Sequence, residues 1–289
     1  AQAEAAMNDI MSGQATGAQI GSYLTALRMK GETVDEIAGS AKSMRAHVVP
    51  VKIPVEVTDG VLIDTVGTGG DGKHTFNIST TAAFVVAGAG FKVAKHGNRA
   101  ASSRSGSADV LMALGGNLTV SAEQVAECVI DVGIGVLYAI NHQLIGVFAP
   151  HLTEPMAHVL HTLGSKAAYV VHGADGLDEL STAGPNQVSY LRDGEVNNIV
   201  IDAQQFGLPR GHIDDFVGGT PEENAVITRA ILSGEDQGPR RDIVLLNAAA
   251  SLTVEDGNIA EGLDIARDAI DSGKALATLD AWVAKTNSF

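Results

Sequence analysis

The stretch Val61-Leu62-Ile63-Asp64-Thr65-Val66-Gly67-Thr68-Gly69-Gly70-Asp71 decides the fold, because an apolar run of strand type ends directly in a glycine-rich loop. A second loop rich in glycine and serine, KHGNRAASSRSGSAD, covers residues 95–109. Each loop lies between a strand-like run and a helix-like run, and such a loop can direct several backbone N–H groups toward one phosphate. The pair of loops, the second with Lys95 and Arg99, predicts one ligand that carries two phosphate groups.

Strand-like and helix-like patterns alternate around these loops. We expect strands at 61–66, 92–95, 136–138, 144–148 and 168–172, and helices at 79–89, 107–114, 121–132 and 154–163. An antiparallel pair, 187–191 and 195–202, is joined by the turn Arg192-Asp193-Gly194, and the tail over 221–285 reads as mostly helical. This alternation predicts an α/β fold with a mostly parallel central sheet flanked by helices.

The N-terminal region has only helical periodicity. Apolar residues recur at helical spacing over 18–29, and Thr33 with Glu36 forms a capping-box pattern that opens a second helix reaching residue 48. Pro50 and Pro54 mark the connection to the next region. We therefore predict a small helical subdomain over 1–52 and a larger α/β domain over 53–289.

Composition excludes several classes of protein. The 289 residues include 19 basic and 34 acidic ones, a formal charge of −15, which argues against a general affinity for nucleic acid or anionic lipid. No apolar run approaches the length of a membrane span, and the N-terminus lacks a signal-peptide pattern, so we expect a cytoplasmic protein. The single cysteine, Cys128, allows no intrachain disulfide or cysteine-rich zinc site and is expected to be a structural thiol.

The glycine loop is ambiguous when it is taken alone. Residues 67–72 match neither the Walker nor the dinucleotide pattern, so a plain turn and a ligand contact both remain open. The next stretch, Thr75-Phe76-Asn77-Ile78-Ser79-Thr80, opens a helix whose free N–H groups favour an anion. Asn77 or Ser79 is the expected helix cap, and capping and anion binding are compatible.

The block from Lys95 to Ser107 is the most informative. Its donor-rich loop favours anion binding, whereas His96 fits a structural role as well as a substrate contact. Asp178 and Glu179 follow the strand that ends at His172, where adjacent carboxylates suit Mg²⁺, although an exposed acidic turn is the alternative. His158 and His161 share a helix face but have no clear third metal ligand beside Glu154.

Taken together, these motifs resemble the anthranilate phosphoribosyltransferases, the enzymes of tryptophan biosynthesis. The likeness runs over nearly the whole chain, whereas class II pyrimidine nucleoside phosphorylases share the architecture but differ in both loops. The resemblance implies Mg²⁺-dependent transfer of the phosphoribosyl group from phosphoribosyl diphosphate (PRPP) to anthranilate. It also implies two Mg²⁺ per subunit, and a homodimer joined through the helical subdomain.

The resemblance also implies the roles of individual residues. Anthranilate would face Gly67, His96 and Asn98, and the Mg²⁺ ions would be bound by Ser79, Asp178 and Glu179. No residue is expected to act as acid or base, because an aromatic amine is already unprotonated at neutral pH, and Lys95 would act electrostatically. The residues implied in PRPP binding are Gly67, Gly70, Asp71, Thr75, Asn77, Ile78, Ser79, Thr80, Lys95, His96, Gly97, Asn98, Arg99, Ser102, Ser103 and Ser107.

One departure from the family lies near residues 139–141. The family has several tens of residues there, including the arginine expected to bind the anthranilate carboxylate, whereas here Val136-Leu137-Tyr138-Ala139 runs almost directly into the strand at 144–148. His142 belongs to the lead-in of that strand and does not replace the missing histidines. Either the protein lacks this segment, or the sequence as read omits it. Measuring the mass of the intact chain distinguishes these two explanations, because the printed sequence corresponds to 29.7 kDa and the missing segment would add to it.

Three functions therefore compete. The first is the transferase. The second is a PRPP-binding relative with impaired or no anthranilate transfer, because the acceptor-binding segment is missing. The third, a nucleoside phosphorylase, is disfavoured by the block of lysine and serines at 95–107.

Overall fold

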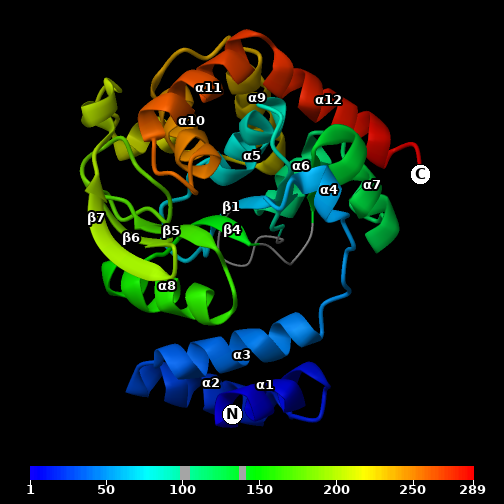
Figure 1. The fold of residues 1–289 in the computed structure, drawn as a ribbon, viewed down its shortest axis with the longest axis vertical. Helices are drawn as coiled ribbons and strands as arrows, with labels where there is room; N and C mark the ends of the chain where they lie inside the picture. Colours follow the sequence, from blue (N-terminus) through cyan, green and yellow to red (C-terminus); the bar gives the residue numbers. More distant parts are fainter. Residues whose placement is uncertain (98–104, 137–140) are drawn as a thin grey trace.

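One mixed sheet organises the α/β domain in the computed structural model, which describes residues 1–97, 105–136 and 141–289 (Figure 1). Its strand order within these residues is β3-β2-β1-β4-β5-β6-β7. The strands are β1 (Ile63–Gly67), β2 (Val93–Lys95), β3 (Ile134–Val136), β4 (His142–Gly146), β5 (Ala167–His172), β6 (Asn186–Arg192) and β7 (Glu195–Ile201).

The first five strands pair in parallel, and β6 and β7 add an antiparallel hairpin at one edge. Its turn places Asp193 and Gly194 at φ of 53° and 81°, the conformation that a two-residue hairpin loop requires. The α/β fold with a mostly parallel sheet and the antiparallel hairpin are thus confirmed.

Helices cover both faces of the sheet. On one face, α5 (Ile78–Gly88) and α10 (Pro239–Leu252) contact β1, and on the other α8 (Thr153–Thr162) contacts β5 and β6 (Figure 1). The main apolar core lies beneath α5 and α10. The remaining helices of this domain are α4 (Val55–Thr58), α6 (Ser107–Ala113), α7 (Ala122–Val132), α9 (Pro221–Leu232), α11 (Ile259–Asp271) and α12 (Lys274–Thr286), with short 3₁₀ turns at Pro150–Leu152, Ala203–Phe206 and Ile213–Phe216.

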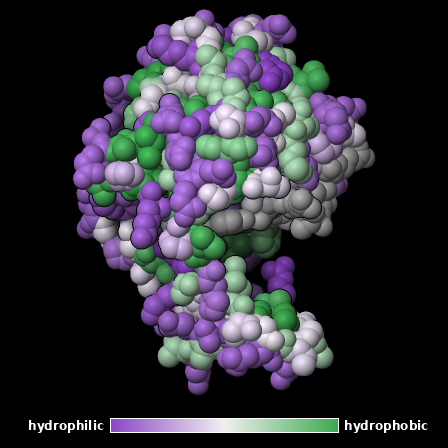
Figure 2. Space-filling model, turned by 90° about the vertical axis from the view of Figure 1, so that its right-hand side faces the viewer, coloured by the Kyte–Doolittle hydropathy of each residue, from purple (hydrophilic) through white to green (hydrophobic). Residues whose placement is uncertain are grey.

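The N-terminal helices form a separate layer. They are α1 (Gln2–Met11), α2 (Gly17–Lys30) and α3 (Val34–Ala46), and the predicted capping box of Thr33 and Glu36 opens α3. The α3 helix packs on α8, where Arg45 donates to the carbonyl of Leu163 at 3.0 Å. Figure 2 shows the molecule hollowed between this subdomain and the α/β domain. No helix in the described part of the chain is both long and apolar enough to cross a bilayer.

Two strands, β3 and β4, begin two residues earlier than predicted. The structure places β3 and β4 at 134–136 and 142–146, whereas the sequence predicted 136–138 and 144–148. The pairing explains the difference, since Val93 aligns with Ile134 and Ile63 aligns with His142. Of the predicted β3 residues, 137 and 138 lie outside the described residues.

Candidate active site

A polar cleft opens at the carboxyl ends of β1 and β2, where open parallel sheets commonly bind ligands. Five segments meet there: the glycine loop after β1, the end of β2, the start of α5, the start of α6 and the segment after β5. Lys95 on β2 and Asp178 after β5, far apart in sequence, therefore line one site. The lining residues are Val66, Gly67, Thr68, Gly69, Gly70, Asp71, Gly72, His74, Thr75, Phe76, Asn77, Ile78, Ser79, Thr80, Lys95, Ser105, Gly106, Ser107, Asp178 and Glu179.

The glycine loop is shaped by left-handed backbone conformations. Gly69, Gly70 and Gly72 have φ of 74°, 88° and 68°, which residues with a Cβ rarely adopt. The backbone N–H of Gly69 donates to Oδ2 of Asp178. This bond ties the loop after β1 to the acidic segment after β5.

Two further glycines let the acidic segment approach the sheet. Gly67 and Gly146 are register partners on β1 and β4. A Cβ on Gly67 would clash with the carboxylate of Asp178, and one on Gly146 would clash with the carbonyl oxygen of the same residue. Asp178 therefore lies directly against the ends of both strands.

The start of α5 is capped differently from the prediction. Asn77 holds the cap position, but its side chain makes no capping hydrogen bond. Its amide instead donates to the carbonyl of Ser105 at 3.3 Å and accepts from Asn224 at 3.0 Å, which joins α5 to α6 and α9. The N–H of Ser79 donates to Oε1 of Glu179 at 3.2 Å. A carboxylate thus lies at the positive end of the α5 dipole.

The carboxylates of the cleft have strongly perturbed acidity. Burial, reinforced by the charge of Asp71, raises the pKa of Asp178 to about 7. Burial together with the charge of Asp178 raises the pKa of Glu179 to about 8, against the opposing effect of Lys95. Oδ2 of Asp71 is buried and lacks a hydrogen-bond partner among the described residues. These groups would be stabilised in their ionised forms by an added cation.

Lys95 is not a solvated strand tip. Its side chain is only 1% exposed, and burial lowers the pKa of its ammonium while the charges of Asp64 and Glu179 oppose that change. The ammonium donates to the carbonyl of His96 at 2.9 Å. A buried lysine with donor capacity left beyond this bond can bind an anionic oxygen in the cleft.

The same residues fit Mg²⁺. Asp178 and Glu179 offer hard oxygen ligands, and Asp71 adds a buried oxygen that has no partner in the described part of the chain. No three His, Cys, Asp or Glu side chains among the described residues are grouped to hold a metal ion by themselves. A site with only one or two carboxylate ligands suits Mg²⁺, because waters and substrate phosphates commonly complete the coordination shell of this ion.

The cleft gathers most of the residues that the sequence singled out. Its lining includes every predicted PRPP or metal residue of the segments 67–80 and 178–179, together with Lys95 and Ser107. His96 and Gly97 follow directly at the end of β2, where burial and the charge of Lys95 lower the pKa of His96 to about 4. Asn98, Arg99, Ser102 and Ser103 lie outside the described residues.

Sequence reasoning missed several residues that shape the site. Asp64 is fully buried beside Lys95, Gly146 makes room for Asp178, and Asn224 holds Asn77. Asp64 had a visible signal, namely a charged residue inside an apolar strand. Gly146 and Asn224 had none, because their roles depend on contacts across the fold.

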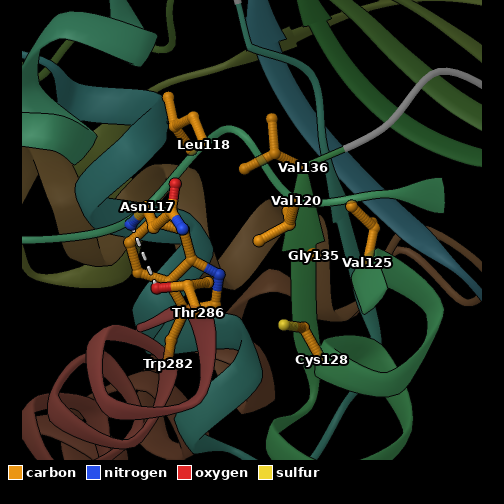
Figure 3. Close-up of a pocket in the computed structure, with 9 residues that line it drawn as sticks. All are labelled: Asn117, Leu118, Val120, Val125, Cys128, Gly135, Val136, Trp282 and Thr286. Carbon is orange, nitrogen blue, oxygen red and sulfur yellow. Dashed lines mark hydrogen bonds between the residues drawn. The ribbon is translucent and has the colours of Figure 1, made fainter. Parts of the chain in front are cut away.

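A second cavity lies between β3, α7 and α12 (Figure 3). Asn117 donates through its N–H to Oγ1 of Thr286 at 3.1 Å on one side, and Cys128 lies on the other. Cys128 is 1% exposed, and burial raises the pKa of its thiol, as expected for a structural thiol. The cavity is mostly apolar and offers no group for phosphate chemistry. Its lining residues are Asn117, Leu118, Val120, Val125, Cys128, Gly135, Val136, Trp282 and Thr286.

Comparisons with known proteins agree with this geometry. Residues 1–48 match the helical bundle domain of the glycosyl transferase family, and residues 59–143 and 138–276 match its a/b domain. Anthranilate phosphoribosyltransferase of Symbiobacterium thermophilum is 49% identical over 316 aligned positions, which cover 97% of this chain and 91% of that protein.

Solved structures give the same result. The crystal structure of anthranilate phosphoribosyltransferase from Thermus thermophilus has a TM-score of 0.90 at 35% identity, covering 99% of this chain and 94% of that one. The Saccharomyces cerevisiae enzyme in complex with PRPP and Mg has a TM-score of 0.86 at 27% identity, covering 98% and 91%. Another structure of the yeast enzyme contains 4-fluoroanthranilate, with a TM-score of 0.86 at 26% identity and coverage of 99% and 92%.

Proposed function

The chain belongs to the anthranilate phosphoribosyltransferase family, and we propose that it transfers the phosphoribosyl group of PRPP to anthranilate, giving phosphoribosylanthranilate and diphosphate for tryptophan biosynthesis. The observation that carries this proposal is the cleft that joins the glycine loop, Lys95 and the Asp178–Glu179 pair. Among the relatives, the yeast enzyme binds PRPP with Mg and binds 4-fluoroanthranilate.

In this proposal the bond between C1 of the ribose and the diphosphate oxygen breaks, and a bond from C1 to the anthranilate nitrogen forms. Negative charge develops on the departing diphosphate, which the ammonium of Lys95 and the backbone N–H groups of Gly70 and Asp71 stabilise. The N-terminus of α5 contributes further N–H groups at Asn77 and Thr80. The amine attacks as a neutral nucleophile and then loses a proton, so positioning and electrostatics carry the rate.

We assign the metal ligands to Ser79, Asp178 and Glu179, with two Mg²⁺ per subunit. When bound, Mg²⁺ supplies positive charge that stabilises the leaving diphosphate. The raised pKa values of Asp178 and Glu179 support this assignment, because two buried neighbouring carboxylates, one of them also facing the charge of Asp71, favour a cation. We assign PRPP contacts to the remaining predicted residues of 67–80 and 95–107, and anthranilate contacts to Gly67, His96 and Asn98.

The assay for this function follows the native fluorescence of anthranilate. With PRPP and Mg²⁺ present, the signal should fall in proportion to enzyme, and omission of either should stop the loss. A constant signal at every enzyme concentration would reject the transferase.

A second candidate function is PRPP binding without anthranilate transfer. The alignment with the Symbiobacterium protein spans 316 positions, more than the 289 residues of this chain, so that protein has residues without a counterpart here. The match to the a/b domain breaks into two pieces at 138–143. PRPP binding with unchanged anthranilate fluorescence would identify this second function.

We further propose that the protein is a homodimer joined through residues 1–52, with residues 53–289 as the PRPP-binding domain. The support is that α2 buries none of its 14 residues, and that Leu24 and Met29 are 48% and 83% exposed. A second copy is the partner that would cover this helix. We propose a cytoplasmic location, because PRPP and the product carry phosphate charges that a bilayer excludes.

A further inference from the structure

A buried carboxylate that the proposed chemistry does not use lies just behind the cleft. Asp64 is on β1, three residues before Gly67, and its side chain is 0% exposed. Its Oδ1 accepts the backbone N–H of His96 at 3.0 Å. The carbonyl of the same His96 accepts the ammonium of Lys95 at 2.9 Å. The backbone of His96 is therefore held on one side by Asp64 and on the other by Lys95.

This arrangement determines where the end of β2 lies. The next residue, Gly97, has no room for a Cβ beside the side chain of Val136 on β3, so the chain passes close to that strand. In the register of β1 and β2, Ile63 pairs with Val93, at the end of β2 that lies away from the cleft. The hydrogen bond between the Asp64 side chain and the N–H of His96 thus links β1 to the end of β2 beside the cleft, close to the ammonium of Lys95.

Keeping this carboxylate buried costs free energy. Its Oδ2 has no hydrogen-bond partner within the described part of the chain, and Nδ1 of His96 is 4.0 Å away, too far for a hydrogen bond. Burial accordingly raises the pKa of Asp64 to about 6, against the opposing charge of Lys95. This cost is better explained by what the carboxylate holds in place, the backbone of His96 and through it the Lys95 ammonium, than by the stability of the fold alone.

We propose that Asp64 is a positioning residue for PRPP binding, which fixes the Lys95 ammonium in the cleft by holding the backbone of His96. It acts through Lys95 and does not touch the substrate. This inference rests on the proposed function, because it assigns to Lys95 the binding of the diphosphate.

The test compares three variants by titration calorimetry with PRPP and Mg²⁺. Asp64→Ala removes the acceptor and should weaken PRPP binding by about 10-fold or more, the usual effect of losing a hydrogen bond to a charged group. Asp64→Asn keeps an acceptor for the His96 N–H and should restore most of that affinity. Thr65→Val is the matched control, because Thr65 is equally buried on the same strand and does not line the cleft. It should bind PRPP as the wild type does.

Steady-state kinetics adds a readout that a general loss of stability would not give. Asp64→Ala should raise the KM for PRPP while leaving the KM for anthranilate and the melting profile near those of Thr65→Val. Wild-type affinity in Asp64→Ala, or equal losses in Asp64→Ala and Asp64→Asn, would overturn the proposal.

A second measurement needs no ligand and separates this inference from the proposed function. In protein labelled with ¹⁵N-histidine, the amide resonance of His96 should lie downfield and be protected from exchange, and Asp64→Asn should move it while keeping the protection. An unprotected His96 amide in the wild type would overturn the positioning role even if PRPP binds. A protected amide in a wild type that fails to bind PRPP would instead reject the proposed function.

Discussion

Gly146 lies directly beneath the backbone carbonyl of Asp178, so close that a Cβ at position 146 would overlap that oxygen. Gly67, its register partner on β1, leaves similar room for the carboxylate of the same aspartate. The absence of two side chains at the ends of neighbouring strands thus allows the acidic segment to reach the glycine loop. The proposed metal site depends on this approach.

Gly146→Ala should displace the Asp178 segment. Because the clash is with backbone rather than with a flexible side chain, we expect a loss of about 1–3 kcal/mol in the free energy of unfolding, together with weaker Mg²⁺-dependent PRPP binding. Urea unfolding and calorimetry measure the two effects. Gly17→Ala is the control, since a Cβ there would meet no described atom within 4 Å and its φ is not positive. Equal behaviour of the two variants would show that residue 146 does not constrain Asp178.

The stability of the ligand-free protein should fall with rising pH. The folded-state pKa values of Asp178 and Glu179, about 7 and about 8, lie above the ordinary values of 3.8 and 4.5. Between those limits the folded state binds more protons than the unfolded state, so this contribution is present at low pH and is lost as pH rises toward 8. Melting temperatures without Mg²⁺ should therefore decrease from about pH 6 to about pH 8.5.

The double variant Asp178→Asn, Glu179→Gln is the control for this effect. Its melting temperature should vary less over the same range, and added Mg²⁺ should stabilise the wild type more than the variant. If the melting temperature of the variant changes with pH as much as that of the wild type, the titrating groups are not Asp178 and Glu179.

Lys95→Met should weaken PRPP binding by about 10- to 100-fold, the range expected when a hydrogen bond to a charged group is lost. Methionine keeps much of the buried volume, so the change mainly removes the charge. Cys128→Ser, at a residue of the second cavity, should leave PRPP affinity unchanged. The reverse pattern, with Cys128→Ser impaired and Lys95→Met unaffected, would contradict the assignment of the cleft.

The proposed dimer predicts that charges on α2 separate the subunits. Leu24→Glu combined with Met29→Glu should shift the sedimentation coefficient from a dimer to a monomer, because both side chains are exposed in the single chain. Val226→Glu on α9 is a matched control, since Val226 is also an exposed apolar residue, at 69%, but belongs to the α/β domain. A wild-type protein that sediments as a monomer would contradict the proposed dimer.

The sequence predicted the elements well where local patterns dominate. The capping box at Thr33, the hairpin turn at Asp193-Gly194 and the alternation of strands with helices all have local signatures, and the structure contains each of them. The starts of β3 and β4 were misplaced because pairing with neighbouring strands, rather than local composition, sets where a short buried strand begins.

The site was predictable in outline for a similar reason. Glycine loops, a helix start and paired carboxylates are visible as motifs, and parallel strands bring their carboxyl ends to one edge. What the sequence could not give were the cross-fold contacts, such as Glu179 on the N–H of Ser79 or Asp64 on that of His96. Asn77 was expected to cap its own helix because nothing local indicates Asn224 as its partner.

The most direct test of the central claim is calorimetric titration of the wild type with PRPP, with and without Mg²⁺, beside the variant Glu179→Gln. The cleft described above predicts binding of one PRPP per chain that depends on Mg²⁺ and is strongly reduced in Glu179→Gln. Binding that is equally tight without Mg²⁺ and in the variant would contradict the claim that Asp178, Glu179 and Lys95 form one site for a metal-bound diphosphate.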